Sequence, residues 1–109
     1  MKISILGTEY EIDLVKNHND KALDNSDGYC DSSVKQIVVD DMSESVGHVG
    51  VKKDLNQYRK KVVRHEVIHA FLYESGLAEN SWGENEEIVD WIAVQFPKML
   101  AAFREVDAL

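Results

Sequence analysis

One helical pattern, between Asp54 and Gly76, constrains the fold of this chain more than any other feature. Asp54 followed by Gln57 has the form of a capping box, and Gly76 suits the position just after a helix end. Apolar residues recur between them every three or four positions and predict one buried stripe: Leu55, Tyr58, Val62, Val63, Val67, Ala70 and Phe71. We therefore expect a long amphipathic helix here, and the rest of the chain must cover its apolar face.

The middle of this helix carries the pentad His65-Glu66-Val67-Ile68-His69. Histidines four positions apart project from one face of a helix, so both imidazoles can reach a single metal ion. Zinc is the predicted ion, because it accepts neutral imidazole nitrogen and keeps one position open for water in catalytic sites. Glu66 lies about 100° round the helix from His65 and can face that open position as a general base. The alternative is a pair of solvated or hydrogen-bonded histidines.

The length and charge of the chain limit its class. Its 109 residues, 44% of them hydrophobic, fit one domain over residues 1–109. A net charge of -8 argues against a nucleic-acid-binding surface, since neutralising phosphates needs clustered cations. One such cluster does occur, and we expect it to be a solvated helix face: Arg59, Lys60, Lys61 and Arg64.

The chain shows no signal peptide and no apolar run that approaches a membrane span. We therefore expect a cytoplasmic protein with no membrane partner. Cys30 is the single cysteine, so no internal disulfide can form, which agrees with a reducing compartment. A free thiol is the expected state of Cys30, with a role as a zinc ligand as the alternative.

The first forty residues carry strand patterns. Apolar and polar residues alternate from Ile3 to Leu14 around a turn at Gly7-Thr8, which predicts a β-hairpin. A second hairpin is expected from Gly28 to Asp41, with a turn at residues 31–33 and a β-branched strand after it. Because the connections are short, we expect a small, mostly antiparallel sheet of three or four strands. The stretch from Met42 to Lys53 is expected to be a loop.

A second helix is predicted after residue 81. Ser81 with Glu84 offers another capping box, and Pro97 predicts a kink or a new helical segment. Its apolar stripe is expected to comprise Ile88, Ile92, Phe96, Met99 or Leu100, and Phe103. The predicted fold class is α+β, with the small sheet followed by two main helices.

The second helix also offers a third metal ligand. A short connection can bring the first turn of this helix back beside His69, and Glu86 and Asp90 share one face of it. One carboxylate can bind the metal while the other accepts a hydrogen bond from a ligating histidine. Glu86 is the predicted third ligand, and Glu87 is the alternative because predicted helix registers slip.

The pentad, followed by Asn85-Glu86 and then Asp90, resembles the gluzincin pattern of zinc metallopeptidases such as thermolysin. The second half of the chain also resembles the small ImmA/IrrE-type metallopeptidases of bacteria and phages, with the segment from Glu86 to Ala93 in the place of their second motif. More specifically, the chain looks like a short protein that recurs in prophages of Gram-positive bacteria.

This resemblance implies a minimal zincin-like fold, with zinc bound by His65, His69 and Glu86. It also implies Glu66 as the general base and Asp90 as the residue that supports a ligand. The chain departs from the family motif at Val89 and Ile92, which replace Ala and Phe.

The function that follows is zinc-dependent hydrolysis of peptide bonds in a protein or peptide substrate. We expect the substrate to lie against an exposed edge strand, and the segment from Val34 to Asp40 is the predicted edge. The chain has no clear equivalent of the His or Tyr that stabilises the oxyanion in larger gluzincins. The candidates are Tyr73, Tyr58, Tyr29 and His48, while His18 is expected at the surface.

A rival hypothesis is a regulatory module whose zinc site is structural or vestigial. Such a module would bind a protein partner, for example a phage repressor. The short chain and the missing oxyanion group favour it, whereas Glu66 disfavours it, because a structural site has no use for a base. A third hypothesis is an ordinary α+β domain that binds no metal. The sequence leaves the oligomeric state open.

Overall fold

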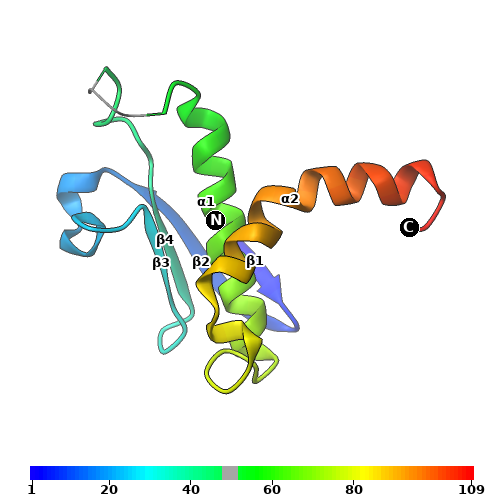
Figure 1. Ribbon diagram of the computed structural model, residues 1–109. Coiled ribbons are helices and arrows are strands. Elements are labelled where there is room, and N and C mark those ends of the chain that lie inside the picture. Colours follow the sequence, from blue (N-terminus) through cyan, green and yellow to red (C-terminus); the bar gives the residue numbers. More distant parts are fainter. Residues whose placement is uncertain (48–51) are drawn as a thin grey trace.

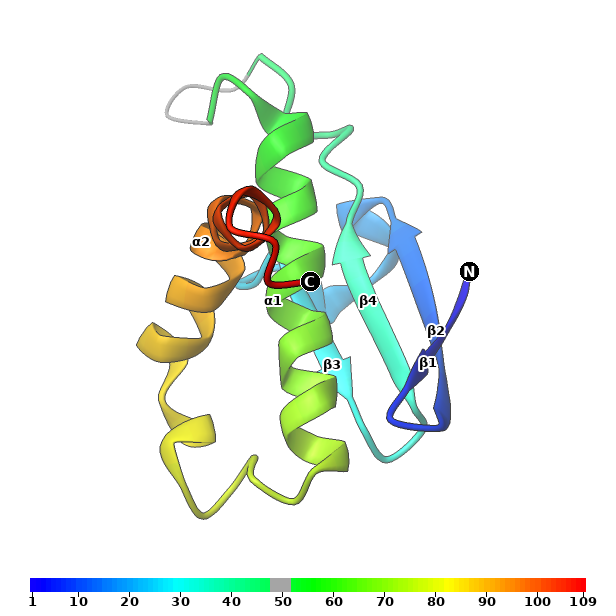
Figure 2. The ribbon, with the colours of Figure 1, turned by 90° about the vertical axis from the view of Figure 1, so that its right-hand side faces the viewer.

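The computed structural model describes residues 1–47 and 52–109 as a four-stranded sheet followed by two long helices, which confirms the α+β class (Figure 1). The strands are β1 (Lys2–Ile5), β2 (Thr8–Val15), β3 (Gly28–Asp31) and β4 (Gln36–Asp40). The helices are α1 (Leu55–Glu74) and α2 (Glu86–Glu105), with short 3-10 turns η1 (Asn17–Asn19), η2 (Lys21–Leu23) and η3 (Trp82–Glu84). The sheet, α1 and α2 form successive layers, with α1 in the middle (Figure 2).

The sheet has the strand order β1-β2-β4-β3. The two predicted hairpins are present, because β1 pairs antiparallel with β2 and β3 pairs antiparallel with β4. The remaining pair, β2 with β4, is parallel. The sheet is therefore mixed and mostly antiparallel, and the parallel pair joins strands separated by the long connection that contains η1, η2 and β3.

The prediction that the segment from Val34 to Asp40 forms an edge strand is wrong. Val34 lies in the turn before β4, and β4 itself runs between β2 and β3 in the interior of the sheet. Ile37, Val38 and Val39 are all buried, which is the pattern of a strand covered on both faces rather than of an edge. Among the described strands, the edges belong to β1 and β3, and β3 lies on the side of α1 that carries the histidines.

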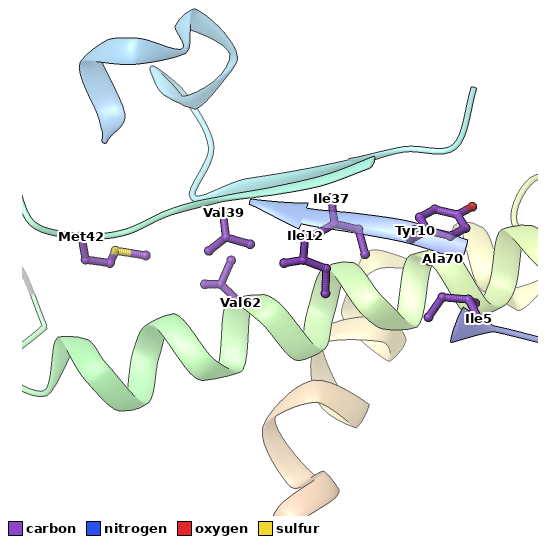
Figure 3. Packing of buried hydrophobic residues seen from close by; sticks show 8 residues of the cluster. All are labelled: Ile5, Tyr10, Ile12, Ile37, Val39, Met42, Val62 and Ala70. Carbon is purple, nitrogen blue, oxygen red and sulfur yellow. The ribbon is translucent and has the colours of Figure 1, made fainter. Parts of the chain in front are cut away.

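Helix α1 begins and ends as predicted. The Asp54 carboxylate accepts a hydrogen bond from the Gln57 N–H at 3.1 Å, and Gly76 takes a φ of +78° just beyond the helix. Val62 and Ala70 pack against sheet residues such as Ile12 and Val39 (Figure 3). Phe71, expected in the buried stripe, is 42% exposed, because it lies on the face turned toward α2 rather than toward the sheet.

The start of α2 differs from the prediction. Ser81 caps the short turn η3, and the cap of α2 is Asn85, whose side chain accepts a hydrogen bond from the Ile88 N–H at 3.1 Å. Gly83 makes this tight connection possible, because a Cβ there would overlap the carbonyl oxygen of Leu77. Two consecutive caps occur because the chain reverses through a separate helical turn before α2 begins.

Pro97 lies inside α2, and the helix changes direction in its middle, as predicted (Figures 1 and 2). Proline has no N–H to offer the carbonyl of Ala93, four residues earlier. The Nε of Arg64 donates to that carbonyl oxygen at 2.6 Å instead. The kink in α2 therefore carries one of the contacts that attach α2 to α1.

The buried face of α2 is narrower than the predicted stripe. Only Val89 and Ala93 of the helix are buried, whereas Ile88, Phe96 and Phe103 are each at least 38% exposed. The contact with α1 involves small side chains in the first half of α2, and the second half extends away from the other elements (Figure 1). None of the helices in the described ranges has the length and apolar character needed to cross a bilayer.

Candidate metal centre

The two histidines of the pentad face each other from successive turns of α1. Their ring centroids are 4.8 Å apart and their Nε2 atoms are 3.1 Å apart. Their side chains are only 17% and 22% exposed, so the backbone and the packing both hold the rings. The i, i+4 spacing thus produces the convergence of nitrogen atoms that the sequence predicts.

Glu86, at the first turn of α2, brings a carboxylate to both rings. Its oxygens lie 3.0 Å from the His65 Nε2 and 3.0 Å from the His69 Nε2. The Asn85 cap fixes where α2 begins and therefore which carboxylate meets the histidines. Glu87, the alternative third ligand, is exposed and makes no contact with either histidine in the described structure.

These three groups fit a zinc ion. Two imidazole nitrogens and one carboxylate oxygen form a triangle with sides of 3.0 to 3.2 Å. Tetrahedral zinc with bonds of about 2.0–2.1 Å separates its ligand atoms by about 3.3 Å, so little movement is required. The set also leaves a fourth position without a protein ligand, as catalytic zinc sites do.

Asp90 and Lys61 support this triangle from behind. The Nδ1 of His65 lies 3.1 Å from an Asp90 carboxylate oxygen and can donate a hydrogen bond to it. The lone pair of the neutral ring is then on Nε2, where it can bind a metal. The Lys61 ammonium donates to the same oxygen at 3.0 Å. The hydrogen bond from Lys61 lowers the pKa of Asp90, with a smaller contribution from His65, so this carboxylate stays ionised.

Glu66 lies beside the triangle, and neither ring is hydrogen-bonded to it among the described residues. It is 7% exposed, and one of its carboxylate oxygens lies within 4.8 Å of the ring nitrogens of His65 and His69. Burial raises the pKa of Glu66 above its usual value, a direction suited to a group that accepts and releases a proton near neutral pH.

The triangle opens into a cleft of about 450 Å³ between α1 and the edge strand β3. Gly28, Tyr29 and Cys30 of β3 form the wall opposite the histidines. The sequence offered Tyr29 and Cys30 as single candidates but did not predict that their strand walls the site. Burial, together with the nearby Glu66, raises the pKa of the Cys30 thiol to about 11. Among the described residues, the side chains whose ligand atoms all lie within 4.8 Å of one another are His65, Glu66 and His69, and Cys30 is not one of them.

The tyrosines considered as oxyanion donors occupy different places. Tyr73 lines the cleft, one turn beyond His69 on the same face of α1. Tyr29 also lines it, but its hydroxyl donates to Asp20 at 2.6 Å, and the Tyr58 hydroxyl donates to Asp27 outside this cleft. His48 lies outside the described residues.

Two other predictions concern charged residues. His18 is at the surface as expected, where its ring contacts Glu44. The basic cluster is not a uniform solvated face, because Lys61 turns to Asp90 and Arg64 turns to α2. Two features of the sequence could have predicted these contacts. Lys61 lies one turn before His65 on the same helix face, and Pro97 leaves the Ala93 carbonyl without its helical N–H donor, which Arg64 replaces.

Comparisons with protein-family models, with curated proteins and with solved structures find no match to this chain. The resemblance to ImmA/IrrE-type metallopeptidases therefore stays a prediction from the motifs. The arrangement of His65, His69, Glu86 and Glu66 and the cleft beside them are the features of this chain that bear on its function.

Proposed function

We propose that this protein is a zinc-dependent metallopeptidase, with His65, His69 and Glu86 as the zinc ligands and Glu66 as the general base. The observation that carries the proposal is the triangle of two Nε2 atoms and one carboxylate, 3.0 to 3.2 Å apart, open to a cleft. A purely structural zinc site would enclose its ion with four protein ligands. The open side and the buried carboxylate of Glu66 favour catalysis instead.

Each residue then has a defined task. A bound zinc ion supplies Lewis acidity and lowers the pKa of a coordinated water. Glu66 would take a proton from a water in the cleft and deliver it to the leaving nitrogen, a role that its raised pKa favours. Asp90, held by Lys61, keeps the His65 ring oriented with Nε2 toward the open cleft.

The substrate is proposed to bind along β3. This strand is at an edge of the sheet, so one row of its backbone N–H and C=O groups faces away from β4. An extended peptide can pair with that row and place one carbonyl in the cleft between β3 and α1. Tyr73 is the proposed hydrogen-bond donor to the oxyanion, because it lines the same cleft and its hydroxyl has no partner among the described hydrogen bonds.

Metal content is the first test. The protein should be purified without chelators or an affinity metal column, loaded with zinc, and measured by mass spectrometry beside Glu86→Ala and Glu87→Ala. We expect about one zinc per chain in the wild type and in Glu87→Ala, and a large loss in Glu86→Ala. Absence of zinc from the wild type after loading would overturn the proposal.

Activity is the second test, with fluorescein-labelled casein and a mixed peptide library as probes. Glu66→Gln should retain zinc while the rate of hydrolysis falls by about 10²–10⁴-fold, because the base is lost and the ligands are not. Equal rates in the two proteins would argue that Glu66 has no catalytic role. Zinc binding with no hydrolysis of either probe would favour the regulatory module that binds a protein partner.

A further inference from the structure

The projecting half of α2 continues an apolar stripe that the metal centre does not explain. Its members follow alternating intervals of four and three residues, the spacing of helices that pair along a seam. They are Ile92, Phe96, Met99, Phe103 and Val106. The residue that follows the last of them is Asp107.

Around and beyond Pro97 most of this stripe is exposed in the described structure, and Met99 is half-buried. Phe96 is 46% exposed, Phe103 is 43% exposed and Val106 is 71% exposed. All nine residues from 101 to 109 are exposed. The segment extends away from the sheet and from α1 in Figure 1, and in Figure 2 it is seen end-on, pointing toward the viewer.

An apolar groove of about 380 Å³ lies at the base of this projection, between α1 and α2. Four side chains of α1 and two of α2 form it: Val63, Val67, Ile68, Phe71, Ile92 and Phe96. Arg64 is the one charged residue among those that line it. Since Ile92 and Phe96 belong to the stripe, the groove and the projecting helix form one continuous apolar surface.

We propose that this surface is the interface of a homodimer in which two projecting helices pack antiparallel. If Met99 lies at the two-fold axis, positions equally far before and after it meet across the pair. Val106 of the second copy then lies opposite Ile92, since both are seven positions from Met99. Phe103 of the second copy, four positions after Met99, lies next to Phe96, three positions before it, so both enter the groove. Each chain supplies the same protruding side chains and the same groove, which is what a closed two-fold interface requires.

Charge and area both favour a second copy as the occupant. Asp107 follows the stripe and would approach Arg64, which contacts Ala93 next to Ile92. The exposed parts of Phe71, Phe96, Phe103 and Val106 amount to roughly 350 Å² per copy, since a Phe side chain presents about 200 Å². Two copies with their polar flanks bury on the order of 1,000 Å², the low end for a specific interface, so we expect micromolar affinity.

The dimer leaves the metal centre open. Val67, Ile68 and Phe71 lie on the face of α1 turned toward the groove, and none of the residues that line the groove lines the cleft of His65 and His69. Dimerisation through this surface is therefore independent of the peptidase function.

The test is sedimentation equilibrium of the full chain from about 5 to 500 µM. We expect a monomer at the lower limit and a dimer at the upper limit. Phe103→Glu should raise the dissociation constant at least about thirtyfold, because a charge would be buried within the interface, one helical turn from Met99. Ala101→Glu adds the same charge to the opposite face of the helix and should leave the constant unchanged. A monomer at every concentration, or a dimer that Phe103→Glu does not weaken, would overturn the proposal.

A cysteine cross-link tests the arrangement itself. In a Cys30→Ser background, Met99→Cys should form an intermolecular disulfide rapidly when diamide is added, because the two sulfurs meet near the axis. Ala101→Cys points away and should cross-link at least about tenfold more slowly. Equal rates for the two variants would contradict an antiparallel pair centred on Met99. Circular dichroism of all variants, whose sites are largely outside the core, confirms that each is folded.

Discussion

The two long helices have twenty residues each, but they are used differently. Helix α1 has the sheet on one side and α2 on the other, and its buried residues are distributed from Val62 to Leu72 (Figure 2). Helix α2 buries only Val89 and Ala93, both in its first half. Helix α1, which carries His65, Glu66 and His69, is therefore held on both sides. The positions of Glu86 and Asp90 depend instead on how the start of α2 is attached to α1.

The largest effect in this comparison is expected from a substitution on α1. Tyr73→Phe should lower kcat by about 10²-fold with zinc content unchanged, because one oxyanion donor is removed from the cleft. Tyr29→Phe is the matched control on the opposite wall, where the hydroxyl already donates to Asp20. Steady-state kinetics on a labelled peptide measure both. Similar losses in the two variants would assign no special role to Tyr73.

The next largest effect is expected on zinc affinity, from a substitution on α2. Asp90→Ala should lower zinc affinity by about 10–100-fold, because His65 loses the acceptor that fixes its ring. Glu87→Ala removes an exposed carboxylate from the same helix and should leave the affinity nearly unchanged. Competition with a chromophoric chelator measures both affinities. If the two variants bind zinc equally well, Asp90 does not support the site.

A pair of alanine substitutions compares the packing of the helices directly. Ala70 is fully buried on the face of α1 that packs against the sheet. Ala70→Leu should therefore destabilise the fold by about 1–3 kcal/mol through overpacking. Ala101 is exposed on α2, and Ala101→Leu should change stability by less than about 0.5 kcal/mol. Urea unfolding at low protein concentration gives both values. A comparable cost at Ala101 would show that the projecting half of α2 is packed.

Arg64 tests the attachment of α2 at its kink. Arg64→Met should cost about 1–2 kcal/mol, since the buried Ala93 carbonyl would lose the donor that replaces the missing N–H of Pro97. Lys60→Met changes an exposed cation of the same helix and should have little effect. Thermal unfolding of the two variants provides the comparison. A stable Arg64→Met protein would mean that the kink does not depend on this hydrogen bond.

The smallest effect concerns β3, which faces α1 across the cleft. With its pKa raised from 9.0 to about 11, the Cys30 thiol is ionised about a hundredfold less at pH 8 than an ordinary thiol. Because a more basic thiolate is also more nucleophilic, alkylation by iodoacetamide should be about tenfold slower in the folded, metal-free protein than in urea. The rate should rise as the pH approaches 11. Equal rates in the folded and unfolded chains would contradict the buried environment.

Local patterns were sufficient where neighbouring residues decide the structure. The Asp54 cap, the C-terminal Gly76 and the facing rings of His65 and His69 follow from helix geometry, because residues four apart share a face in any helix. The two hairpins and the kink at Pro97 were likewise predictable, since alternation and the missing proline N–H act over a few residues.

The tertiary structure alone decided the features that depend on contacts between elements far apart in the sequence. The stripe on α2 has perfect spacing, yet Val89 and Ala93 became the buried residues because only the first half of α2 packs beside α1. The apolar run before Asp40 entered the centre of the sheet and left the edge to β3, because pairing partners are chosen over long sequence distances. Thus the sequence by itself determined which atoms can converge on an ion, and the fold decided which carboxylate meets them and which strand walls the cleft.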